Sequence, residues 1–309
     1  MYRFKLFQNG AADFHMLSSR LEVAMPIKPA VAVIIPAYNR LDFIEEAVSS
    51  VLSQSFQNLE LIVVDDGSTD GTGDLVRERF DDERLKVYSQ DNLGVSAARN
   101  RGVNESSAPL VAFLDSDDYW LEEKLTTQLL AMEKDAQRIS YTGEVWYRRG
   151  KWANPCSHHE KHSGDIFSKC LPLCIISPSS VLMERSLFEE VGGFDETLPA
   201  CEDYDLWLRI SARCGVLFCP EKLIVKRNGH EGQLSQEIWG LDRFRIAALW
   251  KLVYDSGIED DKRREALRWI VKKSRVVAGG AKKRGALERA QVFERSRKEA
   301  ESWLMRLER

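Results

Sequence analysis

An acidic cluster in the stretch FLDSDDYW, residues 113–120, is the first candidate for chemistry. Three carboxylates, Asp115, Asp117 and Asp118, directly follow the apolar run 108–114. Carboxylates this close repel one another, which favours their neutral forms unless a cation or several hydrogen-bond donors offset the charge. The cluster is therefore either a solvated turn that caps the next helix or a site where something positive binds. We expect Asp118 to be the dispensable member, as a helix cap or an outer support.

A second acidic stretch, CEDYDLWLRI (residues 201–210), has helical periodicity. Asp203 shares one helical face with three apolar residues, Leu206, Trp207 and Ile210. Asp205 and Arg209 are spaced to pair at i,i+4 on another face. Asp203 is therefore expected to meet an apolar wall, where a carboxylate holds a proton more readily than in water and suits a general base. The alternative is that acids favour the first turn of a helix because of its dipole.

Other motif-like stretches fail against known templates. DDGSTDGTGDLVR resembles a calcium-binding EF-hand loop if Asp66 is its first residue, but the twelfth is Arg77 where a glutamate is required. The sequence has no GxxxxGK[ST] phosphate loop, and GTGDLV lacks the third glycine of a dinucleotide fingerprint. The cysteine and histidine residues between positions 156 and 174 match no standard zinc spacing, which favours a polar loop there.

Alternating strands and helices must position these acids. Apolar, β-branched runs predict buried strands at 31–35, 59–64, 85–89 and 109–114. Amphipathic stripes predict helices at 42–54, 70–80 and 95–103. Each polar loop falls where a strand has just ended. This is the doubly wound α/β pattern, in which ligands lie beyond the carboxyl ends of the strands.

The second half of the sequence is less regular. A predicted helix carries Leu121, Leu125, Leu129 and Met132. It is followed by predicted strands at 138–149, 178–184 and 216–225, a polar loop at 150–168, and helices at 185–191 and 202–214. From about residue 235 the pattern is helical, with a break expected at Gly279 and Gly280.

Composition and charge narrow the function classes. The 309 residues are 44% hydrophobic and 30% charged, as in ordinary globular proteins. From Lys251 onward, 17 basic and 10 acidic residues give a net charge of +7. Since the whole chain has a net charge of -4, the first 250 residues have a net charge of -11. An acidic body argues against nucleic acid as the main partner. The sequence predicts no transmembrane helix and no signal peptide, and therefore a cytoplasmic protein whose six cysteines are reduced.

The basic tail has scattered apolar positions, such as Leu267, Ile270, Phe293 and Trp303. Such helices can pack on their own domain, join a second subunit, or lie against an anionic membrane surface. We favour packing on the domain, because the tail still holds many acids and its apolar stripe is interrupted.

Five stretches occur together in a fixed order: VAVIIPAYNR, LELIVVDDGSTDGT, NLGVSAARNRG, VAFLDSDDYW and ACEDYDLWLR. Their order and spacing resemble family-2 inverting glycosyltransferases of the glycosyltransferase-A fold, over about residues 30–240. The resemblance implies a Rossmann-like mixed sheet flanked by helices. We divide the chain into an N-terminal extension (1–30), a catalytic domain (31–240) and a C-terminal helical appendage (241–309). Within the domain, 31–134 would bind the nucleotide and 135–240 the acceptor.

For the donor, the resemblance implies a nucleotide-diphosphate sugar and a divalent cation, Mn²⁺ or Mg²⁺. Asp115-Ser116-Asp117 matches the family's Asp-x-Asp element, which puts Asp117 on the metal and Asp115 near the ribose and the metal. His230 matches a place where related enzymes often bring a histidine to the metal, although a lone loop histidine more often faces solvent.

The nucleotide itself would meet Pro36, Ala37, Tyr38 and Asn39 at its base and ribose. Asp66 would accept a hydrogen bond from the base imide, which favours a UDP-sugar, and Arg99 would lie near the nucleotide. Each has a plain alternative. The first four residues also suit a strand-to-helix turn, the Asp-rich stretch DDGSTD suits a cap for the next helix, and Arg99 suits a surface helix position.

For catalysis, the resemblance makes Asp203 the base and Glu202 a residue that orients the acceptor. One base opposite the leaving group implies inversion at the anomeric carbon. The acceptor would be a glycan or a lipid-linked sugar, in surface polysaccharide synthesis, and the enzyme would be cytoplasmic or peripheral at the inner face of the membrane. A noncatalytic nucleotide-sugar binding module and a sugar-phosphate nucleotidyltransferase are the rival functions. The nucleotidyltransferase would need a glycine-rich, arginine-bearing loop where PAYNRL stands.

Overall fold

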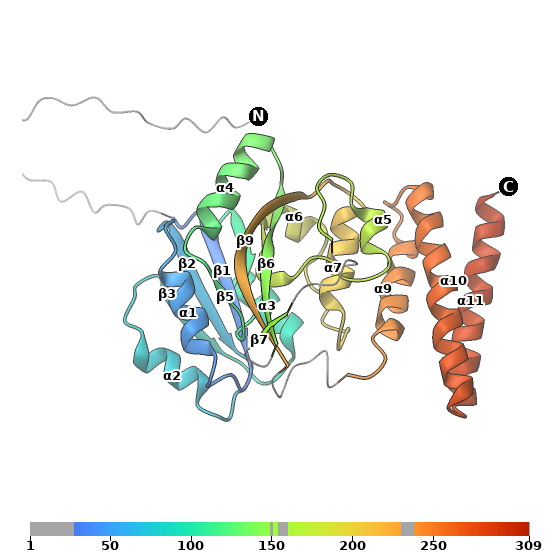
Figure 1. Ribbon diagram of the computed structural model, residues 1–309, viewed down its shortest axis with the longest axis horizontal. Coiled ribbons are helices and arrows are strands. Elements are labelled where there is room, and N and C mark those ends of the chain that lie inside the picture. Colours follow the sequence, from blue (N-terminus) through green and yellow to red (C-terminus); the bar gives the residue numbers. More distant parts are fainter. Residues whose placement is uncertain (1–27, 149–150, 154–159, 230–237, 309) are drawn as a thin grey trace, which may run out of the picture.

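The computed structural model describes residues 28–148, 151–153, 160–229 and 238–308. The described strands form one mixed sheet in the order β3-β2-β1-β4-β8-β6-β9-β5, with β7 paired to β6. Helices cover both faces of the sheet, and two long antiparallel helices stand at the far end from β3 (Figure 1). The predicted fold class, a mixed α/β sheet with a C-terminal helical appendage, is confirmed.

The first half builds the parallel part of the sheet. Its strands are β1 (Val31–Ala37), β2 (Leu59–Asp65), β3 (Leu85–Ser89) and β4 (Leu110–Phe113). Its helices are α1 (Ile44–Leu52), α2 (Thr72–Arg79) and α3 (Val95–Asn104). Every residue of β1 is buried, because Val33 packs on one face with α1 while Ile34 packs on the other with α3. An unbroken apolar run is what a strand covered on both faces requires.

The second half adds antiparallel strands and shorter helices. The strands are β5 (Tyr119–Trp120), β6 (Ile139–Arg148), β7 (Lys151–Ala153), β8 (Val181–Glu184) and β9 (Leu217–Asn228). The helices are α4 (Lys124–Asp135), α5 (Phe167–Cys170), the 3₁₀ helix η2 (Pro178–Ser180), α6 (Arg185–Glu190) and α7 (Glu202–Ser211). Strand β8 is antiparallel to β4 and β6, whereas the long β9 runs parallel to β6 and antiparallel to β5.

Three features of this half differ from the prediction. Leu121 lies before α4 rather than in it, and the short strand β5 pairs with β9 just ahead of it. Strand β7 lies inside the predicted polar loop and pairs with the end of β6. These short strands depend on a partner that is distant in sequence, and periodicity within a few residues carries no information about that partner.

The C-terminal helices are α9 (Asp242–Tyr254), α10 (Asp260–Lys283) and α11 (Leu287–Leu307). The expected break at Gly279 and Gly280 is wrong, because α10 continues through both glycines. The chain turns instead at Gly285, whose φ of 72° is in the left-handed region that favours glycine.

The tail packs on its own domain, as favoured from the sequence. Apolar residues of α9 and α10, Leu249, Leu252, Leu267 and Ile270 among them, lie in the same core as Trp207 of α7. Lys251 of α9 also donates to Asp195 at 2.6 Å and to Asp205 of α7 at 3.0 Å. Among the described residues, no helix is long and apolar enough to cross a membrane.

Candidate functional site

A cavity of about 720 Å³ lies beyond the carboxyl ends of β1, β2 and β4. Ten of the predicted site residues line it: Pro36, Ala37, Tyr38, Asn39, Asp66, Arg99, Asp115, Asp117, Glu202 and Asp203. The two predicted halves thus meet at one cavity, with α7 as the wall supplied by the second half. The remaining predicted residue, His230, lies outside the described residues.

The wall formed by the ends of β1 and β2 is held by its own polar side chains. The buried Asp66 accepts hydrogen bonds from Gln90 Nε2 (2.8 Å) and from the backbone N–H groups of Leu93 (2.9 Å) and Gly94 (2.8 Å). Asn39, at a left-handed φ of 52°, accepts a hydrogen bond from the Thr69 N–H at 2.8 Å. Asp66 therefore organises the loop before α3 and is not a helix cap, while its contact with a base stays a prediction.

Arg99 joins the two halves at the floor of the cavity. Its guanidinium donates to Asp115 Oδ1 at 2.7 Å and to Glu202 Oε1 at 2.8 Å, and it lies 4.9 Å from the centre of the Phe194 ring. Burial opposes its charge, but Asp115 and Glu202 raise the pKa of Arg99 above its ordinary value. The alternative of a surface arginine is wrong, because only 3% of Arg99 is exposed.

Glu202, which is predicted to orient the acceptor, is itself held in place by an ion pair. It is buried, and one carboxylate oxygen is held by Arg99. Burial and the neighbouring Asp203 raise the pKa of Glu202, while Arg99 acts in the opposite direction. An acceptor would therefore meet a carboxylate whose position is already fixed by an ion pair.

The acidic cluster after β4 is divided between the cavity and the interior. Asp115 and Asp117 are partly exposed at the cavity, whereas Asp118 is 1% exposed. Asp118 accepts hydrogen bonds from Ser179 Oγ at 2.7 Å and from the Arg227 N–H at 3.1 Å, and its carboxylate lies 3.9 Å from Lys226 Nζ. Burial raises the pKa of Asp118, and Lys226 opposes this.

Of the two roles expected for Asp118, the helix cap is therefore wrong, whereas its contacts are those of an outer support for the cluster. Helix α4 begins at Lys124, and its N-cap Glu123 makes no side-chain capping bond. Asp118 instead ties the acidic cluster to η2 and to the end of β9. Losing its acceptors would leave the Ser179 hydroxyl and the Arg227 N–H without these bonds in the interior.

The donor set at the cavity fits a hard divalent cation. Asp115 and Asp117 offer carboxylate oxygens, and Mg²⁺ and Mn²⁺ bind such ligands together with phosphate and water. Asp115 uses Oδ1 for Arg99, which leaves Oδ2 for another ligand. The described residues contain no group of three or more His, Cys, Asp or Glu side chains that could hold a metal ion.

Asp203 stands at the first turn of α7 with both carboxylate oxygens in hydrogen bonds. Oδ1 accepts from the Tyr204 N–H at 2.6 Å, and Oδ2 lies 3.3 Å from the Cys174 thiol, whose single proton the Ile176 carbonyl, at 3.1 Å, can also accept. The apolar residues expected beside it, Leu206, Trp207 and Ile210, are buried in the core. The predicted apolar wall is therefore wrong in its composition, because Cys174 stands beside the carboxylate. The predicted Asp205–Arg209 pair is confirmed at 2.6 Å.

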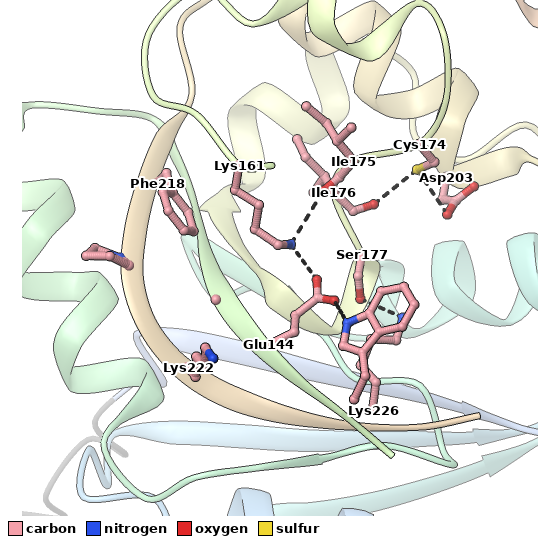
Figure 2. A pocket seen from close by; sticks show the side chains of 13 residues that line it. Glu144, Lys161, Cys174, Ile175, Ile176, Ser177, Asp203, Phe218, Lys222 and Lys226 are labelled. Carbon is pink, nitrogen blue, oxygen red and sulfur yellow. Dashed lines mark hydrogen bonds and ion pairs between the residues drawn. The ribbon is translucent and has the colours of Figure 1, made fainter. Parts of the chain in front are cut away.

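A second cavity of about 290 Å³ adjoins the first and shares Asp203, Cys174 and Lys226 with it. Figure 2 shows Glu144 pointing into this space, held by Lys161 at 2.5 Å. Burial opposes ionisation, but Lys161 and Lys226 lower the pKa of Glu144 below its ordinary value. Asp203 thus lies between a larger space that the sequence associates with the donor and a smaller one beside β6.

Among the lining residues that sequence reasoning missed are Cys174, Lys226, Arg227 and Arg245. Lys226 and Arg227 directly follow the apolar LIV of β9, the same strand-end signal that identified the aspartates. Arg245 lies on α9, beyond the predicted catalytic domain. Cys174 has no sequence signal that distinguishes it from a core cysteine.

Comparison with known proteins identifies the family of this chain. The family model for glycosyl transferase family 2 matches residues 32–192, just over half of the chain. The Escherichia coli UDP-Glc:alpha-D-GlcNAc-diphosphoundecaprenol beta-1,3-glucosyltransferase WfaP is 31% identical over 189 residues, which cover 59% of this chain and 70% of WfaP. Uncharacterised Rickettsia glycosyltransferases are also similar, but the chain spans only 26–30% of their length.

Two solved structures share the fold. Staphylococcus aureus TarS 1-349, in complex with UDP-GlcNAc, superposes with a TM-score of 0.65 at 18% identity, covering 90% of this chain and 91% of that one. The Pyrobaculum calidifontis mannosyltransferase PcManGT, in complex with GDP-Man and Mn²⁺, gives a TM-score of 0.60 at 18% identity, covering 88% and 86%. With its motif residues gathered at one cavity and its family model matched over most of the predicted domain, the chain belongs to glycosyl transferase family 2.

Proposed function

We propose that this protein transfers a sugar from a nucleotide-diphosphate donor, favouring a UDP-sugar, to a hydroxyl of a glycan or lipid-linked acceptor, with inversion. The observation that carries the proposal is that the carboxylates expected at the diphosphate, Asp115 and Asp117, line the same cavity as Asp203, the expected base. TarS has been solved in complex with UDP-GlcNAc, and the name of WfaP gives UDP-Glc as its donor and a diphosphoundecaprenol-linked sugar as its acceptor, which supports the donor and acceptor classes. The process served would be surface polysaccharide synthesis.

In this mechanism Asp203 accepts the proton of the acceptor hydroxyl as the oxygen attacks the anomeric carbon, and the nucleoside diphosphate leaves from the opposite face. The Cys174 thiol and the Tyr204 N–H fix the direction of the Asp203 carboxylate. Asp117 and Asp115 would hold Mn²⁺ or Mg²⁺, which as a Lewis acid neutralises charge on the leaving diphosphate. Lys226, Arg227 and Arg245 are additional cations around the same space.

The smaller cavity beside Asp203 is the natural place for the acceptor. Its lining comes from residues 143–226, the half assigned to the acceptor, and Asp203 is the point it shares with the donor space. Glu202 would orient the acceptor from the ion pair with Arg99. A cytoplasmic location, peripheral at the inner face of the membrane, would give access to a lipid-linked acceptor.

A thermal-shift panel of nucleotide sugars, with and without Mn²⁺, tests the proposal directly. A bound donor stabilises by RT ln(1 + [L]/Kd), about 2.7 kcal/mol when the ligand is at about a hundred times Kd. We expect the largest Tm increase from one UDP-sugar with Mn²⁺, and Mn²⁺-dependent release of UDP when an acceptor is added. A panel in which no nucleotide sugar changes Tm would contradict the proposal.

Asp117→Asn is expected to remove the Mn²⁺-dependent part of that increase. The amide keeps the shape of the side chain but lacks the charge that attracts a divalent ion. The matched control is Asp74→Asn on α2, whose side chain is 81% exposed and does not line the cavity. Equal Mn²⁺ responses in wild type and Asp117→Asn would show that Asp117 is not a ligand.

Cys174→Ala is expected to lower kcat/KM about fivefold, because a side-chain hydrogen bond contributes about 1 kcal/mol. Burial and Asp203 raise the pKa of Cys174 well above its ordinary value, so at neutral pH the thiol carries the proton that it donates. Cys174→Ser keeps a donor and should retain most of the activity. Steady-state kinetics over a range of pH separate the two variants, and equal profiles would exclude this orienting role.

A further inference from the structure

The turn that joins α10 to α11 carries an unusual concentration of exposed positive charge. Residues 282–289 contain four basic residues, Lys282, Lys283, Arg284 and Arg289, against one acid, Glu288. All five are exposed. Leu287, in the middle of the segment, is 63% exposed. We refer to residues 282–289 together with Trp239 as the basic tip.

Trp239 reaches the basic tip from the chain ahead of α9. Its ring lies 4.9 Å from the Arg284 guanidinium and 4.8 Å from that of Arg289, and it is still 49% exposed. Among the ion pairs of the described residues, the tip contributes only Lys282, which contacts Glu294 at 3.0 Å. The tip therefore presents a leucine and a tryptophan surrounded by cations that the fold itself does not neutralise.

The basic tip lies at the same edge of the molecule as the candidate site. In Figure 1 the strands β1 and β2 run downward, so their carboxyl ends and the cavity lie at the lower edge of the molecule. The turn between α10 and α11 lies at the same lower edge. A flat surface that touched the tip would thus lie on the side of the molecule to which the cavity belongs.

We propose that the basic tip binds the surface of an anionic lipid bilayer. A tryptophan and a leucine among lysines and arginines suit the boundary between headgroups and acyl chains, where anionic lipids attract the cations. A second copy of the tip would carry the same charge and be repelled. Nucleic acid fits poorly, because the first 250 residues have a net charge of -11. The link to a lipid-linked acceptor rests on the proposed function, whereas the binding itself does not.

Co-sedimentation of the purified full chain with vesicles tests the proposal. We expect binding to vesicles of phosphatidylcholine mixed with phosphatidylglycerol, no binding to phosphatidylcholine alone, and weaker binding as salt rises. The variant Lys283→Ser/Arg284→Ser/Arg289→Ser should lower the partition coefficient about a hundredfold, since each basic residue near the surface contributes about 1 kcal/mol, or about fivefold. Leu287→Ser should weaken binding while leaving its salt dependence unchanged.

The matched control removes the same charge from the exposed flank of α10. Arg268, Lys272 and Arg275 are exposed, occupy one helical face, and lie away from the turn. If Arg268→Ser/Lys272→Ser/Arg275→Ser lost as much binding as the tip variant, net charge rather than the tip would account for the attraction. Failure of the wild type to bind anionic vesicles would overturn the proposal.

The same variants distinguish this inference from the proposed enzyme activity. The tip variant should retain the nucleotide-sugar thermal shift, because none of its three changes touches the cavity lining. If the wild type bound anionic vesicles but no nucleotide sugar changed its Tm, the membrane role of the tip would stand and the proposed transferase activity would be contradicted. If a nucleotide sugar raised Tm but the wild type did not bind anionic vesicles, the proposed transferase activity would stand and the membrane role of the tip would be contradicted.

Discussion

Asp203→Asn is expected to lower the rate of sugar transfer by about 10²–10⁴-fold, the usual contribution of a general base. The amide can still accept the Tyr204 N–H at the same position but cannot take a proton from the acceptor hydroxyl. Donor binding should persist, because the donor contacts assigned to the cavity lie on other residues. Single-turnover transfer measured beside the donor thermal shift separates these two effects.

Asp205→Asn is the matched control, two positions along the same helix. Asp205 is 1% exposed and pairs with Arg209 at 2.6 Å and with Lys251 at 3.0 Å. Its substitution should lower Tm because it weakens a buried ion pair, while the per-molecule rate of the folded protein falls much less. Full transfer activity in Asp203→Asn would exclude Asp203 as the base.

Arg99→Met is expected to cost about 3–5 kcal/mol of unfolding free energy, because it leaves the buried Glu202 and the partly exposed Asp115 without their partner. Asp115 and Glu202 would then lack the charge that now joins them across the floor of the cavity. Urea unfolding followed by tryptophan fluorescence measures the loss. Arg99→Lys should recover only part of it, since an ammonium cannot hold two carboxylates in the planar geometry of a guanidinium.

The double variant Arg99→Met/Glu202→Gln provides the internal control. Removing the charge of Glu202 takes away part of the penalty, so the double variant should be more stable than Arg99→Met alone. Additive losses from the two single changes would show that the pair contributes no coupling energy. Donor binding should fall in every Arg99 variant, because Asp115 loses the contact that positions it.

The first half of the fold was predictable because its signals are local. The unbroken apolar run of β1 identifies a strand covered on both faces, and polar residues at the ends of successive strands must meet at one edge of a parallel sheet. Asp66, Asp115 and Asp117 came together at the cavity for that reason. The same rule applied to β9 would have found Lys226 and Arg227.

What the sequence did not reveal depends on long-range contacts. Arg99 has the local pattern of a surface helix residue, and only its own pairing with Asp115 and Glu202 makes its burial possible. Asp118 follows a strand like its neighbours, but its partners Ser179 and Arg227 come from segments about 60 and 110 positions away. Gly279 and Gly280 weaken a helix in isolation, yet the packing of α10 on α9 and α11 keeps it continuous.

The contribution of α9 to the cavity has a consequence for engineering in this family. Leu241 and Arg245 line the donor space although they lie beyond the predicted catalytic domain. A chimaera joined at residue 240 would therefore exchange part of the pocket along with the appendage, and a truncation there would open its wall. Replacing the tail from residue 241 would therefore also change the lining of the proposed donor pocket.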